Sequence, residues 1–272
     1  MSLEVTKQIQ KNRRPPPRKS GKKKLENAGD HLAGLMFMAE GFENRARLEA
    51  DKLLHRYFEE VESAEAEEND DVDAADALMA QSQSIMKERN WEWLETGAKN
   101  VLFCTVSGTD ITKITEWLVT TCQAGNENRH LTRIYPVHDS GRVATDVLEE
   151  LCNKHLKSIL TNPDDSSVWP TYRIHYIKRN NNVILRTDIF EVIGDVMKNM
   201  SLMNRVNLES PDVVLIVQAH KNKLLFAYAK NYDARRKFSL RPLQQSEEHQ
   251  REEGKEEHRQ EEMKEEQSPL DH

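Results

Sequence analysis

A run of five apolar residues at 213–217, Val-Val-Leu-Ile-Val, constrains the fold more than any other feature of the sequence. A strand that faces water on one side alternates apolar and polar residues, and this run has no polar residue to place there. It therefore predicts a strand that is buried on both faces. A turn at 221–223 and a second apolar stretch at 224–229 follow, which predicts an antiparallel hairpin.

Three charged segments lie outside any predicted core. Residues 1–24 hold nine Lys and Arg against one acid, residues 59–76 hold ten acids and no base, and residues 245–272 hold eleven acids against four bases. Segments of this kind bury too little apolar surface to fold alone. The stretch 77–244 holds 22 bases and 18 acids, so the predicted core is mildly basic although the whole chain has a formal charge of −7.

The first half of the core alternates strand and helix patterns. Residues 34–38, 100–106 and 131–137 are predicted strands, and a helix is predicted from Glu43 to about Phe58. A second helix is predicted after Asp110, whose side chain can cap it. This order resembles a ferredoxin-like unit over 31–137 with an acidic insertion at about 59–84.

The second half, predicted as a domain over 138–241, repeats the alternation. Apolar spacing predicts a helix from 143 to 160, a strand at 171–177 and a helix capped by Thr187, and the hairpin follows. Helices on a mixed sheet make the fold class α/β or α+β. Residues 1–30 are expected to be a disordered basic arm, and 242–272 a charged tail that is disordered or helical.

The predicted strand at 171–177 continues into two cations and three amides, Lys178 to Asn182. Its alternation places Tyr172, Ile174 and Tyr176 on one face, and Arg173 and His175 on the other. A lysine ammonium can bind phosphate as a point charge, and an arginine guanidinium can bind it through two parallel hydrogen bonds. The segment therefore indicates either a nucleic-acid contact or an ordinary strand that ends in a solvated, charged turn.

Catalysis has little support in the sequence. The two closest glycines, Gly29 and Gly34, are five residues apart and Leu35 follows the second, so no dinucleotide or phosphate-binding loop is present and no cofactor is expected. The adjacent residues His138, Asp139 and Ser140 cannot converge as a hydrolase triad. The cysteines, Cys104, Cys122 and Cys152, are widely spaced, which predicts buried thiols and no structural zinc. No secretory signal and no membrane-length apolar run occur.

The basic residues support nucleic-acid binding better than any motif supports catalysis. Between residues 128 and 241 the chain holds 18 bases and 12 acids, which favours binding to the backbone of structured RNA over reading of its sequence. By charge alone we expect Arg173 and Arg186 to contact RNA. The N-terminal run that ends in Lys22, Lys23 and Lys24 is interpreted as a nucleic-acid arm or nuclear-import signal, or else as a solubilising tail.

Three segments taken in order resemble a THUMP domain, and more specifically the stand-alone THUMP-domain adaptors of tRNA cytidine acetylation. They are residues 129–137, residues 171–180 and the stretch Val206-Asn207-Leu208-Glu209-Ser210-Pro211 before the buried strand. The resemblance covers roughly residues 31–240. Where the family has Asp and Asn, this chain has Asn207 and Ser210, and residues 139–142 depart from the family's Cys-containing turn.

The resemblance implies a non-enzymatic adaptor that presents tRNA, in this family serine and leucine tRNAs, to an RNA cytidine acetyltransferase, which uses acetyl-CoA and ATP to form N4-acetylcytidine. With the basic N-terminal run, it leads us to expect a nuclear or nucleolar location, and the cytoplasm is a further candidate. Carried over residue by residue, it assigns RNA contacts to Arg133, Lys178, Arg179 and Asn180. Two alternatives stay open: a general structured-RNA-binding module that serves another RNA-modifying enzyme, and an unrecognised RNA-modifying enzyme.

Overall fold

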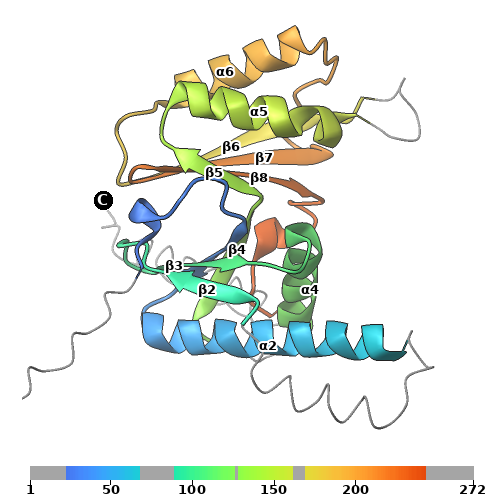
Figure 1. Cartoon of the computed structure of the whole chain (residues 1–272). Coiled ribbons are helices and arrows are strands. Elements are labelled where there is room, and N and C mark those ends of the chain that lie inside the picture. The colour runs from blue at the N-terminus through green and yellow to red at the C-terminus, as the bar shows by residue number, and fades with distance from the viewer. Residues whose placement is uncertain (1–22, 68–88, 126–127, 162–168, 243–272) are drawn as a thin grey trace, which may run out of the picture.

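The computed structural model describes residues 23–67, 89–125, 128–161 and 169–242, and it contains two four-stranded sheets (Figure 1). Helices α5 (Thr145–Leu160) and α6 (Arg186–Asn199) cover one face of the second sheet, and α2 (Glu43–Glu67) and α4 (Ile111–Ala124) pack on the first. The other face of the second sheet joins the core of the first half. The predicted α/β or α+β class is confirmed.

The first sheet has the order β2-β3-β1-β4, and all its neighbouring strands are antiparallel. The predicted strands are present as β1 (Gly34–Ala39), β3 (Val101–Val106) and β4 (Leu131–Val137). Asp110 caps α4 as predicted, because its carboxylate accepts a hydrogen bond of 2.6 Å from the Thr112 N–H. Strand β2 (Trp91–Leu94) was not predicted.

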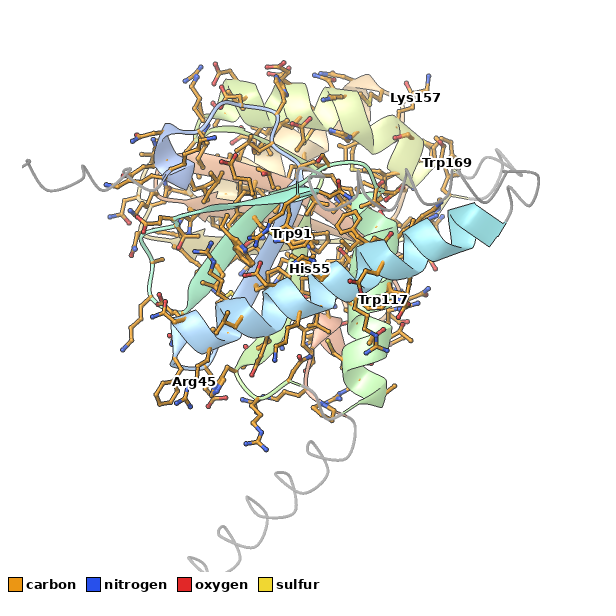
Figure 2. The ribbon with its side chains drawn as sticks, turned by 60° about the horizontal axis from the view of Figure 1, so that its bottom comes forward. Arg45, His55, Trp91, Trp117, Lys157 and Trp169 are labelled. Carbon is orange, nitrogen blue, oxygen red and sulfur yellow. The ribbon has the colours of Figure 1, made fainter. Side chains whose placement is uncertain are left out.

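Helix α2 continues nine residues beyond its predicted end at Phe58, into the segment expected to be an acidic insertion. Contacts with Trp117 stabilise the first turn of this extension. The Glu60 carboxylate accepts from Trp117 Nε1 at 2.9 Å, and Trp117 also lies 5.4 Å from the Tyr57 ring centroid. Figure 2 shows Trp117 and, nearer the start of the helix, Trp91 beside His55. The rest of the predicted insertion, residues 68–84, lies outside the described residues.

The second sheet has the order β5-β8-β7-β6. Its strands are β5 (Asp139–Arg142), β6 (Tyr172–Arg179), β7 (Val213–His220) and β8 (Lys223–Lys230), and only β6 and β7 pair in parallel. All eight residues of β7 are buried, which confirms the prediction of a strand covered on both faces. The predicted hairpin with β8 is also confirmed.

Three local predictions for this half need correction. Lys178 and Arg179 are the last residues of β6, not part of a turn, because the pairing with β7 continues to Arg179 and His220. Thr187 is not the cap of α6, since the helix begins at Arg186 and the Asp188 carboxylate accepts from the Leu185 N–H at 2.9 Å. The extra strand β5 was missed because Asp-Ser-Gly-Arg is a turn-like sequence.

The predicted boundary between the halves, 137/138, falls between the end of β4 at Val137 and the start of β5 at Asp139. Residues 23–30, expected to be part of a disordered arm, instead contain the short helix η2 (Leu25–Asn27), and Leu25 is fully buried. Burial of this leucine anchors the segment against the core. Residues 1–22 and 243–272 lie outside the described residues. The three cysteines are buried, as predicted.

Candidate functional site

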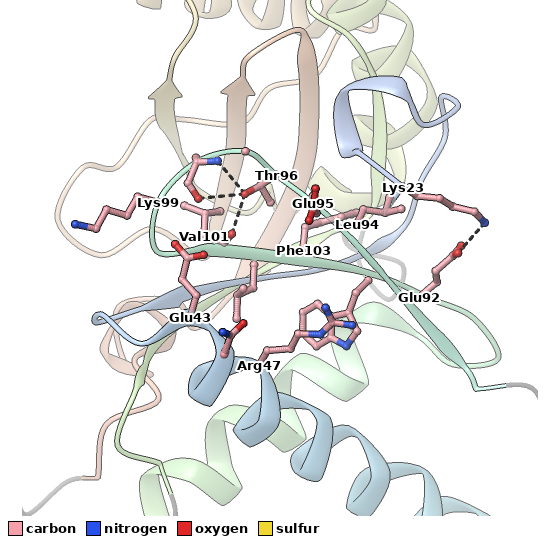
Figure 3. Close-up of a pocket in the computed structure, with 15 residues that line it drawn as sticks. Lys23, Glu43, Arg47, Glu92, Leu94, Glu95, Thr96, Lys99, Val101 and Phe103 are labelled. Atoms are coloured by element: carbon pink, nitrogen blue, oxygen red, sulfur yellow. Dashed lines mark hydrogen bonds and ion pairs between the residues drawn. The ribbon is translucent and has the colours of Figure 1, made fainter. Parts of the chain in front are cut away.

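One cavity, of about 580 Å³, lies beside β2 and β3 and is lined by charged side chains (Figure 3). Protein groups already use these side chains. The Glu43 carboxylate accepts from the Asn100 N–H at 2.6 Å, and Lys23 Nζ lies 2.7 Å from a Glu92 carboxylate oxygen. The Thr96 hydroxyl donates to the Val101 carbonyl at 2.8 Å. These polar side chains therefore connect neighbouring segments of the fold.

A second cavity, of about 560 Å³, brings together arginines from three parts of the chain. Arg133 comes from β4, Arg179 from the end of β6, and Arg241 from the segment after the short helix η3 (Arg236–Phe238). Glu40 is the acidic residue of the lining, and it pairs with Arg241. We call this cavity the basic cavity.

Arg179 reaches from the second sheet toward the first. Its Nη2 donates to Met38 Sδ at 3.4 Å, while its Nε is buried and has no partner among the described residues. Arg133 Nη1 lies 3.5 Å from the Tyr135 hydroxyl. Neither guanidinium forms an ion pair within the described part of the chain. Buried donors in proteins normally have an acceptor, so this arrangement fits an anionic ligand.

The structure places the other residues of the predicted basic turn around Arg179 but not on one face. Lys178 is exposed and belongs to the opposite face of β6, because neighbouring residues of a strand alternate. Asn180 is exposed directly after the strand and has a φ of 50°, a left-handed conformation that asparagine tolerates. Lys178 therefore reaches a ligand from a different side than Arg179 does.

Arg173 and Arg186 lie apart from the basic cavity. Arg173 Nη2 donates to both carboxylate oxygens of Asp233, at 3.0 and 2.9 Å, and its side chain is only 18% exposed. Its charge is therefore largely neutralised within the fold. Arg186 is exposed at the start of α6, and its guanidinium lies 5.2 Å from the centroid of the Phe190 ring.

Lys23 and Lys24 lie beside the end of β2, at the edge of the first sheet opposite β4. Lys24 forms an isolated bridge with Glu95, and its ammonium is 3.6 Å from Glu26. Lys22 lies outside the described residues. Of the nine predicted contacts, Arg133 and Arg179 line the basic cavity, whereas Arg173 and Arg186 line a separate groove beside β6. Arg241 also lines the basic cavity and was absent from the candidate set, since its place depends on the path of the chain after β8.

The potential around β6 is positive. Burial lowers the pKa of His175, and the cations of Arg173, Arg133 and Lys237 lower it further. His175 stacks 6.5 Å from Tyr135 of the basic cavity. The cations that contribute to this lowered pKa also favour negative ligands on this side of the molecule.

The residues His138, Asp139 and Ser140 do not form a catalytic triad. Asp139 accepts hydrogen bonds from His31, Lys154 and His155 at 3.1, 2.6 and 2.9 Å. The Ser140 hydroxyl instead accepts from the Leu32 N–H at 2.9 Å. No group of three or more His, Cys, Asp or Glu in the described ranges is arranged to hold a metal ion. None of the described helices is long and apolar enough to cross a membrane.

Comparison with known proteins identifies part of the chain. Residues 144–227 match the family model of the THUMP domain. The chain is 22% identical over 232 residues to THUMP domain-containing protein 1 of Homo sapiens, and the match covers 79% of this chain and 65% of the human protein. The protein of that name from Bos taurus is 21% identical, with 79% and 64% covered. The match thus spans just under two thirds of the length of these relatives.

Two solved structures resemble this chain weakly. A protein from Pyrococcus horikoshii has a TM-score of 0.43 and 11% identity, covering 73% of this chain and 55% of that chain. A 4-thiouridine synthetase solved with RNA and ATP has a TM-score of 0.37 and 12% identity, covering 73% and 42%. The family match covers α5, most of β8 and the elements between them. Residues 144–227 are thus the part of the chain that matches the THUMP domain, and an antiparallel sheet precedes them.

Proposed function

We propose that the chain binds structured RNA, specifically tRNA, through the basic cavity and the adjoining residues Lys178 and Asn180. The observation that carries this proposal is the convergence of Arg133, Arg179 and Arg241 on one cavity. Two of these guanidinium groups have no acidic partner among the described residues. An arginine fork matches the geometry of phosphate, and desolvated, unpaired donors strengthen such a contact.

Recognition of shape and backbone follows from the same chemistry. Arginines bind phosphates of any sequence, and an A-form helix displays its phosphates and hydroxyls while its major groove is too narrow to read. A THUMP domain and a mildly basic core both favour this mode of binding. Asn180 can add a hydrogen bond to a sugar or a phosphate, because its amide is exposed.

We further propose that the protein is an adaptor that presents tRNA to an RNA cytidine acetyltransferase for N4-acetylcytidine formation, in the nucleus or nucleolus. The partner would use acetyl-CoA and ATP, and this chain would need no cofactor of its own. The described residues support a non-catalytic role, because the Asp139 carboxylate of the Asp-His cluster is already bound by Lys154 and His155. An adaptor accelerates the reaction because it makes the encounter of tRNA and enzyme intramolecular.

A binding experiment tests the RNA site. We expect the double variant Arg133→Gln with Arg179→Gln to bind tRNA about tenfold more weakly and to reduce the log-log salt slope by about 2. Lys52→Gln with Lys113→Gln removes the same charge from exposed positions on α2 and α4 and serves as the matched control. Equal affinity and slope in both double variants would exclude the basic cavity.

A reconstitution tests the adaptor role. The full chain alone, given tRNA with acetyl-CoA and ATP, should modify nothing, and addition of an RNA cytidine acetyltransferase should yield acetylcytidine. The Arg133/Arg179 variant should lose this stimulation. Modification by the chain alone would identify an enzyme, and acetylation that is equal with and without the chain would leave a general RNA-binding module.

A further inference from the structure

Strand β6 is the outer strand of its sheet, and only its first residue has described cover on the outer side. The Tyr172 N–H donates to the Arg205 carbonyl at 3.0 Å, and the Asn207 N–H donates to the Tyr172 carbonyl at 2.9 Å. Strand geometry directs the backbone groups of Ile174 and Tyr176 to this same outer side. No described residue pairs with them.

A groove of about 390 Å³ runs along this edge and includes residues from both faces of β6. Ile174, Phe190, Val206 and Leu208 contribute apolar surface, and Val206 and Leu208 are 60% and 70% exposed. Exposed apolar side chains that gather beside unpaired strand groups mark an interaction site more often than a neutral surface.

The charges on the groove are positive. Arg186 lies at the start of α6 above the Phe190 ring, and Lys237 lines the side formed by η3. Arg173 also lines the groove but is neutralised by Asp233. The groove therefore offers two cations beside aliphatic walls and a line of backbone donors and acceptors.

We propose that this β6-edge groove binds an extended segment of a partner protein, which adds a strand beside Ile174 and Tyr176. Alternate side chains of the segment would be apolar and rest on Val206, Leu208 and Phe190, and at least one acidic side chain would meet Arg186 or Lys237. The inference is independent of RNA binding, because it rests on a strand edge and a groove distinct from the basic cavity.

Charge and apolar surface select this occupant over two others. A second copy of the chain paired through β6 would bring another groove lined by cations and by no acidic side chain, so Arg186 and Lys237 would gain no opposite charge. RNA has phosphates for the cations and hydroxyls for the carbonyls, but it has no aliphatic side chains to cover the exposed Val206 and Leu208. An acidic, apolar peptide satisfies the carbonyls, the N–H groups and the cations together.

The test uses the full chain and a displayed library of random peptides of about ten residues. We expect the enriched peptides to alternate apolar residues and to contain Asp or Glu. A synthetic copy of the best peptide should protect the Ile174 and Tyr176 amides from hydrogen exchange. The variant Val206→Asp with Leu208→Asp should weaken its binding about tenfold, and the wild-type complex should weaken as salt rises.

The control is Leu48→Asp, which changes an apolar residue of similar exposure, 62%, on α2. A failure to enrich peptides, or peptides whose affinity falls equally in the control, would overturn the proposal. A combined result would also overturn it: the Val206/Leu208 variant binds tRNA more weakly, and no peptide protects the Ile174 amide from exchange. The groove would then bind nucleic acid. Loss of tRNA binding in the Arg133/Arg179 variant is measured separately, so the two proposals fail independently.

Discussion

Strands β4 and β6 are both outer strands, and the chain covers them differently. The segment after η3 lies along β4, where Arg133 bridges to Ser239 and the Leu240 N–H donates to the Thr132 carbonyl at 3.0 Å. Among the described residues, β6 has comparable cover only at Tyr172. The segment after η3 thus closes the edge of β4, whereas the bare edge of β6 among the described residues is the basis for the partner strand proposed above.

The largest expected effect tests the cover of β4. Phe238 is 3% exposed and anchors a segment in which Arg236, Lys237 and Phe238 itself all have positive φ, so burial must offset backbone strain. We expect Phe238→Ala to reduce the free energy of unfolding by about 3 kcal/mol, measured by urea denaturation. Leu208→Ala, beside β6, should change it by less than about 0.5 kcal/mol. Similar losses in both variants would remove the contrast between the edges.

The next effect concerns the junction between the two sheets. Burial alone would raise the pKa of the Asp139 carboxyl, but hydrogen bonds from Lys154 and His155 and from the Ser140 N–H lower it to about 2. We expect Asp139→Asn to lose roughly 2 kcal/mol of stability at neutral pH, because the charged form is the one that these donors stabilise. Asp146→Asn, an exposed carboxylate paired with Arg142, should lose much less.

This contribution also has a defined pH dependence. A carboxyl whose pKa is lower in the folded state stabilises the protein above the ordinary pKa of 3.8 and loses that effect as the pH falls toward 2. The stability difference between wild type and Asp139→Asn should therefore be constant above about pH 5 and shrink between about pH 4 and 2. A difference that stays constant down to pH 2 would show that Asp139 is not stabilised in its charged form.

A smaller effect tests the short cover on β6. The Asn207 Oδ1 accepts from the Glu209 and Ser210 N–H groups, both at 3.1 Å, and its Nδ2 donates to the Ser210 carbonyl at 2.8 Å. Asn207→Ala should cost about 1 kcal/mol. Asn207→Asp should cost less, because a carboxylate keeps both acceptor contacts. An equal loss in the two variants would show that the acceptor contacts do not hold this turn.

The smallest stability effect is expected at Lys178, which is exposed near the end of β6. Lys178→Glu should change the free energy of unfolding by less than about 0.5 kcal/mol. It should still weaken tRNA binding and reduce the salt slope by about 1, if one phosphate contact is lost. An unchanged slope would remove Lys178 from the RNA surface.

The sequence predicted elements whose local pattern is strong. The continuous apolar run of β7 and the Asp110 cap of α4 needed no long-range information. Strand β5 has a turn-like sequence, and it forms because it pairs with β8 and because Gly141 allows close approach of Val147. A Cβ at Gly141 would lie 2.4 Å from Val147 Cγ1.

The candidate site was less predictable, because side chains distant in the sequence form it. The resemblance assigned Arg133 and Arg179 to RNA, and only the packing of the two sheets shows that they line one cavity. Charge counting selected Arg173, whose partner Asp233 is 60 residues away and cannot be inferred from local sequence. Charge counting could not show that Lys178 and Arg179 lie on opposite faces of the sheet, because this depends on whether β6 continues as far as Arg179.

The buried cysteines give each half of the molecule its own reporter of opening. Burial raises the pKa of the Cys104 thiol in β3, and it raises that of Cys152 in α5 to about 12. A protonated, enclosed thiol reacts with an alkylating reagent only after its surroundings open. Equal labelling rates for the two thiols would mean that the sheets unfold together, and faster labelling of Cys152 would mean that the THUMP domain opens while the first sheet stays folded.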